Sequence, residues 1–327
     1  MRIFFAGDYI SGTGPANVTK YYIDNLPEGT LYQKRRNKVL RAIEIMIDTI
    51  RADAVVYSGY SMQNILGMKA AKLFGRPCAY LMHGCVEYEN EINREPDPKM
   101  AQAERDMIRL SDAVYAVSPV FCRWLKEYYP DSADKFDYVP NGVDIKLEAT
   151  DGVNRNPHMI FSVGGGMPRK KIAVICKAVE ILRREYDKDM FLVIAGDEGD
   201  DSREIDSYTF VDNRGLVDFE ENVKLMKSAA VFVQNSCFET FGLAPIEAVL
   251  CGCSTLVSKE VGALCILGEV SPDDLIYNCE DEYEIADKIK KLIDKPNASR
   301  LVQGINRESN SWKRRSQMLL EKLSKLV

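Results

Sequence analysis

The stretch NSCFETFGLAPIEAVLCGC, residues 235–253, carries two glutamates on either side of a glycine and a proline. On one continuous helix, Glu239 and Glu247 would lie about 80° apart around the axis and about 12 Å apart along it, too far to share a substrate atom. Pro245 is best tolerated in a first helical turn, so the helix is predicted to begin near Ala244. Glu239 then lies in a strand-to-helix loop, and Glu247 lies in the first turn of the helix.

The backbone between the two glutamates is suited to an anion. Gly242 allows a phosphate to approach closely, and Phe241, Gly242 and Leu243 offer N–H groups at the positive end of the predicted helix. Two carboxylates beside an anion would repel it unless they contact hydroxyl groups. The predicted ligand therefore has a sugar on one side, a ribose on the other and a diphosphate between them. The alternative, that both glutamates only complement the helix dipole, stays open at this point.

Composition narrows the class of protein. The chain has 327 residues, of which 46% are hydrophobic, and a formal net charge of -6. This length suffices for two domains, and the charge gives no indication of a nucleic-acid binder. No apolar run approaches the roughly 20 residues that span a bilayer, so we expect a cytoplasmic protein. Nine scattered cysteines suit a reducing compartment, and with only two histidines in the chain no metal site is expected.

The order of apolar runs predicts an α/β fold. Short β-branched and aromatic runs alternate with longer periodic stretches, which is typical of βαβ units with parallel sheets. The pattern restarts after the polar segment 144–157, which we interpret as a linker between two doubly wound halves. Residues 311–327 form an amphipathic stretch with no strand after it. A helix there must dock on existing structure.

The motifs resemble those of a known family. Residues 235–258 match, almost position by position, the signature of retaining family 4 (group 1) glycosyltransferases with the GT-B fold, although Asn235 replaces the usual proline. VPNGVD at 139–144, FSVGGGMPRKK at 161–171 and FLVIAGD at 191–197 fall in the family's order. The resemblance covers the second half strongly and the first half more loosely.

The resemblance implies a domain arrangement. Two Rossmann-like domains would face each other across a cleft, and the C-terminal helix would cross back to the first domain. On this basis the acceptor-side domain is placed at 1–144 together with 311–327. The domain that binds the nucleotide-sugar donor is placed at 145–310.

The same resemblance implies roles in the second half. Glu247 would bind the nucleotide ribose and Glu239 would lie beside the donor sugar, while the amides of Phe241, Gly242 and Leu243 would hold the distal phosphate.

The family also offers an arginine and a lysine to the diphosphate. Lys170 falls at the lysine position, whereas Gly165 stands where the family has the arginine. The neighbouring Arg169 is the candidate replacement. The alternative is that residues 169–171 are merely a solvated helix start.

In the first half, SGTGPAN follows the first predicted strand but lacks the third glycine and the acidic residue of a dinucleotide fingerprint. The resemblance instead places Gly12, Thr13 and Gly14 opposite the donor diphosphate, and His83 near the sugar. A purely structural role for this histidine stays open. The basic stretch YQKRRNK, 32–38, suggests a peripheral contact with an anionic membrane, and a solvated helix face is its alternative.

The activity that the resemblance implies is retaining transfer of a hexose-type sugar. The donor would be a nucleotide sugar, UDP-linked because UDP is commonest in the family, and the acceptor would be a hydroxyl of a saccharide or lipid-linked saccharide, as in cell-surface polysaccharide synthesis. Glu239, Lys170 and His83 would be catalytic, with no cofactor or metal. Two alternatives stay open: a catalytically silent nucleotide-sugar-binding partner subunit, and a sugar-nucleotide epimerase of the same fold.

Overall fold

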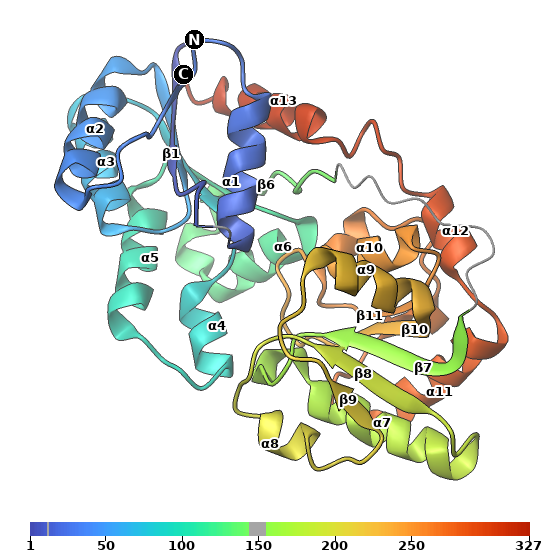
Figure 1. Cartoon of the computed structure of the whole chain (residues 1–327). Helices are drawn as coiled ribbons and strands as arrows, with labels where there is room; N and C mark the ends of the chain where they lie inside the picture. Colours follow the sequence, from blue (N-terminus) through green and yellow to red (C-terminus); the bar gives the residue numbers. More distant parts are fainter. Residues whose placement is uncertain (12, 144–154) are drawn as a thin grey trace. The chain divides into compact units, whose positions relative to one another are not determined.

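The structure is a computed structural model that describes residues 1–11, 13–143 and 155–327 (Figure 1). The chain forms two compact units. The first comprises Met1–Asn90, Pro96–Asp144 and Arg307–Val327, and the second comprises Glu91–Glu95 and Ile145–Asn306. The predicted domain limits differ from these units at 91–95 and at 307–310. Gly12 and most of the predicted linker at 144–157 lie outside the described residues.

The first unit is built on a six-stranded parallel sheet with the strand order β2-β1-β3-β4-β5-β6. Strands β1, β3 and β4 are buried at every position, as expected for parallel strands that are covered on both faces. The strands are β1 (Ile3–Gly7), β2 (Leu31–Tyr32), β3 (Ala54–Ser58), β4 (Cys78–Met82), β5 (Ala113–Ala116) and β6 (Phe136–Tyr138). The helices are α1 (Gly14–Asn25), α2 (Lys38–Arg51), α3 (Met62–Leu73), α4 (Val86–Ile92), α5 (Pro98–Leu110), α6 (Pro119–Tyr128), the 3-10 helix η1 (Pro130–Lys135) and α13 (Trp312–Leu323).

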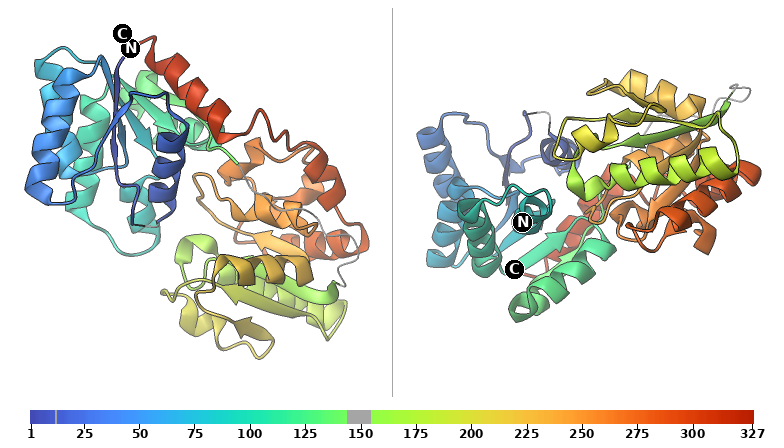
Figure 2. Two further views of the ribbon diagram at one scale, coloured as in Figure 1. Left: turned by 45° about the horizontal axis from the view of Figure 1, so that its top comes forward. Right: turned by 90° about the horizontal axis from the view of Figure 1, so that it is seen from below.

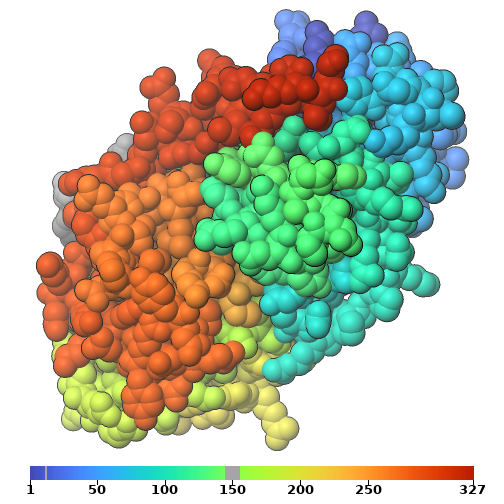
Figure 3. All heavy atoms as spheres, turned by 180° about the vertical axis from the view of Figure 1, so that it is seen from behind, coloured from blue at the N-terminus to red at the C-terminus, as the bar shows by residue number. Residues whose placement is uncertain are grey.

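The C-terminal helix α13 belongs to the first unit, as predicted. It packs beside α1 (Figures 1 and 2), and in Figure 3 its red atoms lie against green residues of the same unit. The Trp312 ring stacks on Tyr21 at a centroid distance of 4.9 Å and meets Tyr22 edge-on at 5.3 Å. A Cβ on Gly142 would lie 2.6 Å from the Trp312 ring. The absence of a side chain at Gly142 therefore makes room for the tryptophan.

The second unit is also built on six parallel strands, in the order β12-β11-β10-β7-β8-β9. Its strands are β7 (Asn156–Val163), β8 (Phe191–Ala195), β9 (Val211–Asn213), β10 (Ala229–Gln234), β11 (Ser254–Ser258) and β12 (Leu275–Ile276). Its helices are α7 (Ile172–Glu185), α8 (Ser202–Ile205), α9 (Phe219–Ser228), α10 (Ala244–Leu250), α11 (Glu282–Asp294) and α12 (Ala298–Gln303), with the 3-10 helices η2 (Pro168–Lys170), η3 (Gly262–Cys265) and η4 (Pro272–Asp274).

The strand order of the second unit fixes where a ligand can bind. The chain starts at β7, adds β8 and β9 on one side, and then returns to add β10, β11 and β12 on the other side. The topology therefore switches between β7 and β10, where the following loops diverge. In open α/β sheets, ligands bind at the carboxyl ends of the strands at such a point.

Two details differ from the sequence analysis. The short strand β2 was not predicted, and the basic residues that follow it precede α2, so that only Lys38 of the stretch 32–38 lies on a helix. The aromatic run SYTFVD, 207–212, predicts a strand over its whole length, but the strand is limited to Val211–Asn213. Across the described ranges, none of the helices combines the length and the apolar character that crossing a membrane requires.

Candidate functional site

Two loops of the second unit meet at its switch point. The loop after β7 carries Arg169 and Lys170 in η2, and the loop after β10 carries Glu239. Arg169 Nη1 lies 3.4 Å from Glu239 Oε2 and 3.3 Å from the carbonyl oxygen of Phe238, to which it donates. Lys170 Nζ donates to the same oxygen of Glu239. The three side chains expose only 16%, 14% and 12% of their surface.

This cluster has a defined charge state. Burial alone would raise the pKa of Glu239, but the nearby Lys170 ammonium and Arg169 guanidinium outweigh it and hold the pKa below its ordinary value. Glu239 is therefore ionised at neutral pH. Because two cations face one carboxylate, the cluster keeps one positive charge in excess, which suits it to an anionic ligand.

The backbone of Glu239 is held by the segment that follows β11. Its carbonyl accepts from the Gly262 amide at 2.9 Å, and the Phe241 carbonyl accepts from the Ala263 amide at 2.7 Å. Glu239 also forms a parallel bridge with Val261. The carboxylate is thus presented from a loop that is anchored to the segment after β11.

The predicted anion-binding turn is formed by residues 241–243. Gly242 has a φ of 78°, in the left-handed region, and a Cβ there would lie 2.9 Å from Glu239 Cγ. The amides of Phe241, Gly242 and Leu243 donate to no acceptor within the described part of the chain. Helix α10 follows directly, beginning at Ala244 as predicted. The turn therefore offers three unpaired donors next to the charged cluster.

Glu247, in the first turn of α10, has a different environment. Its side chain has no ion pair or hydrogen bond to any described residue, and burial raises its pKa to about 7. A carboxylate that is shielded from cations and still half-buried is suited to accept hydrogen bonds from neutral hydroxyl groups. The two glutamates are therefore not equivalent.

Gly165 is required by the packing of its loop. Its φ is 53°, and a Cβ there would lie 1.9 Å from the carbonyl oxygen of Asp197. An arginine cannot occupy this position without moving the loop after β8. Arg169 instead turns inward, while Lys171 pairs with Glu280 at 2.6 Å. The interpretation of 169–171 as a solvated helix start is therefore wrong for Arg169 and Lys170.

The remaining predicted residues lie in the first unit. His83 follows β4, and its Nε2 lies 2.7 Å from Ser58 Oγ, which in turn lies 2.7 Å from Thr19 Oγ1. Burial lowers the pKa of His83 to about 4, so the imidazole is neutral at pH 7. Thr13 caps α1, accepting from the Ala16 amide at 3.4 Å.

Gly14 is the first residue of α1, and Gly12 lies outside the described residues. The placement of Gly12, Thr13, Gly14 and His83 beside a donor stays a prediction.

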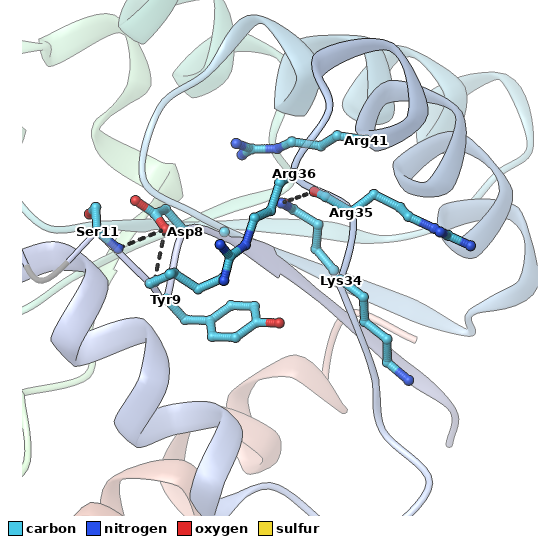
Figure 4. A pocket seen from close by; sticks show the side chains of 10 residues that line it. Asp8, Tyr9, Ser11, Lys34, Arg35, Arg36 and Arg41 are labelled. Carbon is cyan, nitrogen blue, oxygen red and sulfur yellow. Dashed lines mark hydrogen bonds between the residues drawn. The ribbon is translucent and has the colours of Figure 1, made fainter.

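The sequence analysis missed a second polar site. A cavity of about 280 Å³ lies in the first unit between the loop after β1 and the segment that precedes α2 (Figure 4). The basic stretch 32–38, which contains Gln33, was singled out in the sequence, whereas Asp8 and Arg41 were not. The sequence signal that could have indicated this site is the excess of basic over acidic residues in the stretch 32–38.

Comparison with known proteins identifies the family. A profile described as glycosyl transferases group 1 matches residues 145–308, and one described as glycosyltransferase family 4 matches residues 13–147. The chain belongs to the family 4, group 1 glycosyltransferases. The predicted family and enzyme class, a glycosyl-transferring transferase, are confirmed.

Relatives and solved structures agree with this assignment. A D-inositol 3-phosphate glycosyltransferase from Paenarthrobacter aurescens is 26% identical over 304 residues, covering 85% of this chain and 74% of the relative. Anabaena HepE, solved in complex with UDP and glucose, is 15% identical with a TM-score of 0.71, covering 99% of this chain and 100% of that one. Sucrose-phosphate synthase from Thermosynechococcus elongatus gives a TM-score of 0.69 at 16% identity, covering 100% and 99%. The predicted GT-B fold of this glycosyltransferase is thereby confirmed.

Proposed function

We propose that this glycosyltransferase moves a hexose-type sugar, with retention, from a UDP-linked donor to a hydroxyl of a saccharide or lipid-linked saccharide. The observation that carries the donor assignment is the arrangement at one switch point of two inward-turned cations, three unpaired amides and an isolated carboxylate. A nucleotide diphosphate sugar presents the complementary groups. The complexes of HepE with UDP and glucose, and the name of the inositol phosphate relatives, support the proposal.

Each group has an assigned partner in this proposal. Glu247 accepts from the ribose hydroxyls, because its carboxylate, unlike that of Glu239, forms no ion pair with a described residue. The amides of Gly242 and Leu243, with Lys170 and Arg169, hold the diphosphate by charge-assisted hydrogen bonds. Glu239 accepts from hydroxyls of the donor sugar once the diphosphate takes over part of the cationic charge.

The proposed chemistry exchanges one bond at the anomeric carbon for another. The bond from that carbon to the diphosphate oxygen breaks, and the acceptor oxygen attacks from the same face. The acceptor's proton passes to the departing phosphate oxygen. Lys170 and Arg169 stabilise the charge that grows on this oxygen, and the loss of one such donor typically costs about 3–4 kcal/mol of barrier. Because protein cations supply this charge, the proposal includes no metal or other cofactor. His83, neutral at pH 7, is proposed to lie near the sugar.

Calorimetric titration with UDP, GDP and ADP tests the donor site. We expect UDP to bind the wild type and Glu247→Ala to abolish detectable binding, whereas Glu280→Ala, a change at an exposed glutamate of the same unit, should leave the affinity unchanged. A folded wild type that binds none of the three nucleotides would contradict the donor-site assignment.

Product analysis separates the proposed transferase from the two alternatives. With a UDP-sugar panel and an acceptor, product should form only when the acceptor is present. A new sugar nucleotide without acceptor would indicate an epimerase. Nucleotide binding without any turnover would indicate a silent subunit, and the inward position of Arg169 supports the transferase instead.

We further propose that the protein is cytoplasmic and touches an anionic membrane through α2. This helix turns an apolar stripe to solvent, with Val39 and Leu40 exposed by 68% and 50% and Ile43 and Ile47 by 44% and 49%. Basic residues precede it at 34–38. An apolar helix face next to a cationic segment is the pattern of interfacial helices.

Vesicle sedimentation tests this contact. The wild type should bind vesicles that contain phosphatidylglycerol, and the combined change Leu40→Ser, Ile43→Ser and Ile47→Ser should release it. Leu216→Ser, at an apolar residue of the second unit that is 73% exposed, is the matched control. Equal binding by both variants would contradict the assignment of α2.

A further inference from the structure

The cavity in the first unit lies at the carboxyl end of β1, on the edge where open α/β sheets bind ligands. It is formed by the loop 8–11 and by the segment 33–36, which leads into α2, and Arg41 on the first turn of α2 completes it. Its volume is about 280 Å³. A space of this size accommodates a small phosphorylated sugar or polyol.

The lining of this cavity carries more positive than negative charge, and Glu44, just outside the lining, accepts from the amides of Lys34 and Arg35. Four cations line it, Lys34, Arg35, Arg36 and Arg41, and Asp8 is the one acidic residue among its lining. Within the described ranges, none of the four cations lies within ion-pair distance of a carboxylate. Unpaired cations around a concave site repel one another unless an anion joins them.

Two of the cations are directed at the cavity. In Figure 4 the side chains of Arg36 and Arg41 extend toward the loop that carries Asp8 and Ser11, whereas Lys34 and Arg35 extend away from it. Arg41 is half-buried, and its Nε is buried without a hydrogen-bond partner. Guanidinium groups in this position match the several acceptor oxygens of a phosphate group.

The cavity also presents acceptors. Gln33 is only 6% exposed, and its Oε1 is buried without a partner. The Asp8 carboxylate accepts from the amides of Ile10 at 2.9 Å and Ser11 at 3.4 Å, and the free capacity of its oxygens can accept hydroxyl groups. A ligand that satisfies both the arginines and these acceptors must carry an anionic group and hydroxyls together.

We propose that this pocket binds the phosphate group of a hydroxyl-bearing acceptor, with Arg36 and Arg41 on the phosphate and with Asp8 and Gln33 on its hydroxyls. The inference rests on the proposed function, because it assigns the pocket to the acceptor of the transfer. The phosphate can belong to a soluble sugar or polyol phosphate or to a lipid headgroup, and the experiment separates these sources.

Calorimetry with glycerol 3-phosphate, at saturating UDP to occupy the donor site, is the primary test. The wild type should bind glycerol 3-phosphate and not glycerol. Arg36→Gln and Arg41→Gln should each weaken binding by roughly tenfold or more, as expected for loss of a charge-assisted hydrogen bond. Arg51→Gln, on the last turn of the same helix, should leave the affinity unchanged. Arg36 is exposed, so its variant remains informative if Arg41→Gln fails to fold.

Two further measurements test the source of the phosphate and the role of charge in binding it. Asp8→Asn should tighten binding of inorganic phosphate, because it removes the acidic group from the lining. No binding of the wild type to either glycerol 3-phosphate or phosphatidylglycerol vesicles, or equal losses for Arg36→Gln and Arg51→Gln, would overturn the proposal. If Arg36→Gln weakens binding to phosphatidylglycerol vesicles but not to glycerol 3-phosphate, the phosphate belongs to a lipid headgroup and not to a soluble acceptor.

Failure of the donor assignment gives a different result. In that case UDP does not bind, while the dependence of glycerol 3-phosphate binding on Arg36 and Arg41 remains. Conversely, if UDP binds through Glu247 and no phosphate binding depends on these arginines, the donor site stands and the pocket proposal fails.

Discussion

Replacing Glu239 with glutamine is expected to destabilise the second unit much more than Glu280→Gln. The Glu239 carboxylate faces both Arg169 and Lys170, and all three side chains are less than one-fifth exposed. Without the carboxylate, two like charges remain together in a poorly solvated place. The Lys171–Glu280 pair, one residue further along the chain, is the matched control, because its atoms are 2.6 Å apart but the glutamate is 62% exposed.

The burial of the cluster sets the size of the expected loss of unfolding free energy in Glu239→Gln. Breaking a buried ion pair by removing one partner costs about 3–5 kcal/mol, which we reduce to about 2–3 kcal/mol because each side chain keeps some contact with water. For a unit of this size, each kcal/mol lowers the melting midpoint by about 2–4 °C, so Glu239→Gln should lower it by about 4–12 °C. A surface pair contributes about 0–1 kcal/mol, so Glu280→Gln should have a small effect.

The pH dependence provides a second criterion. The folded-state pKa of Glu239 is depressed, because its two cations outweigh burial. Its stabilisation is therefore present above the unfolded pKa, about 4.3, and is lost as pH falls through the folded value. Scanning calorimetry should show the full difference between wild type and Glu239→Gln at pH 7 and a smaller one below pH 4. Equal midpoints for the two glutamine variants at pH 7 would refute the reasoning.

For three further substitutions the structure determines whether the protein becomes more or less stable. Gly165→Arg should destabilise the second unit by about 2–5 kcal/mol in urea unfolding, because the position has a φ of 53° and a Cβ would lie 1.9 Å from the Asp197 carbonyl oxygen. Glu247→Gln should stabilise the protein by up to about 3 kcal/mol at pH 8 and hardly at all at pH 4, because burial raises the pKa of this carboxyl to about 7 and its ionisation opposes folding as pH rises. Trp312→Ala should cost the first unit about 3–5 kcal/mol in the same assay, since the ring is buried and stacked on Tyr21.

The fold could be predicted where the sequence pattern was long and regular. Buried runs such as those of β1 and β4 are apolar at every position, and parallel strands with this pattern are hard to mistake. Strand β2 has only two residues, too few to form a pattern. The strand in the run 207–212 is shorter than its pattern predicts, because Tyr208 and Phe210 pack against the core from outside the sheet. An aromatic run alone does not distinguish such packing from a strand.

The site could be predicted only where its residues are neighbours in sequence. The spacing of Glu239, Gly242 and Glu247 is local, and the turn and helix between them follow from glycine and proline chemistry. The approach of Arg169 to Glu239 joins residues 70 positions apart, so it depends on the pairing of β7 with β10. The cavity that brings Arg41 to Asp8 likewise depends on tertiary structure.

The contrast between the two glutamates leads to a prediction about nucleotide affinity. At pH 7 Glu239 is ionised and its charge is balanced by Lys170 and Arg169. Glu247 has a pKa of about 7 and forms no ion pair with a described residue. If the Glu247 carboxylate accepts from the ribose, binding requires its ionised form. The Kd for UDP should then rise about tenfold for each pH unit below 7 and reach a plateau near pH 8.

The phosphate of UDP titrates in the same range, so the decisive quantity is the difference between the wild type and Glu247→Gln. The variant should bind UDP weakly and should lack the Glu247-dependent part of this pH profile. Calorimetry at pH 6, 7 and 8 measures both. Identical pH profiles for the wild type and Glu247→Gln would mean that Glu247 does not act as a charged acceptor. If the variant loses only the pH-dependent part of UDP binding, the ionised Glu247 carboxylate takes part in recognising the donor.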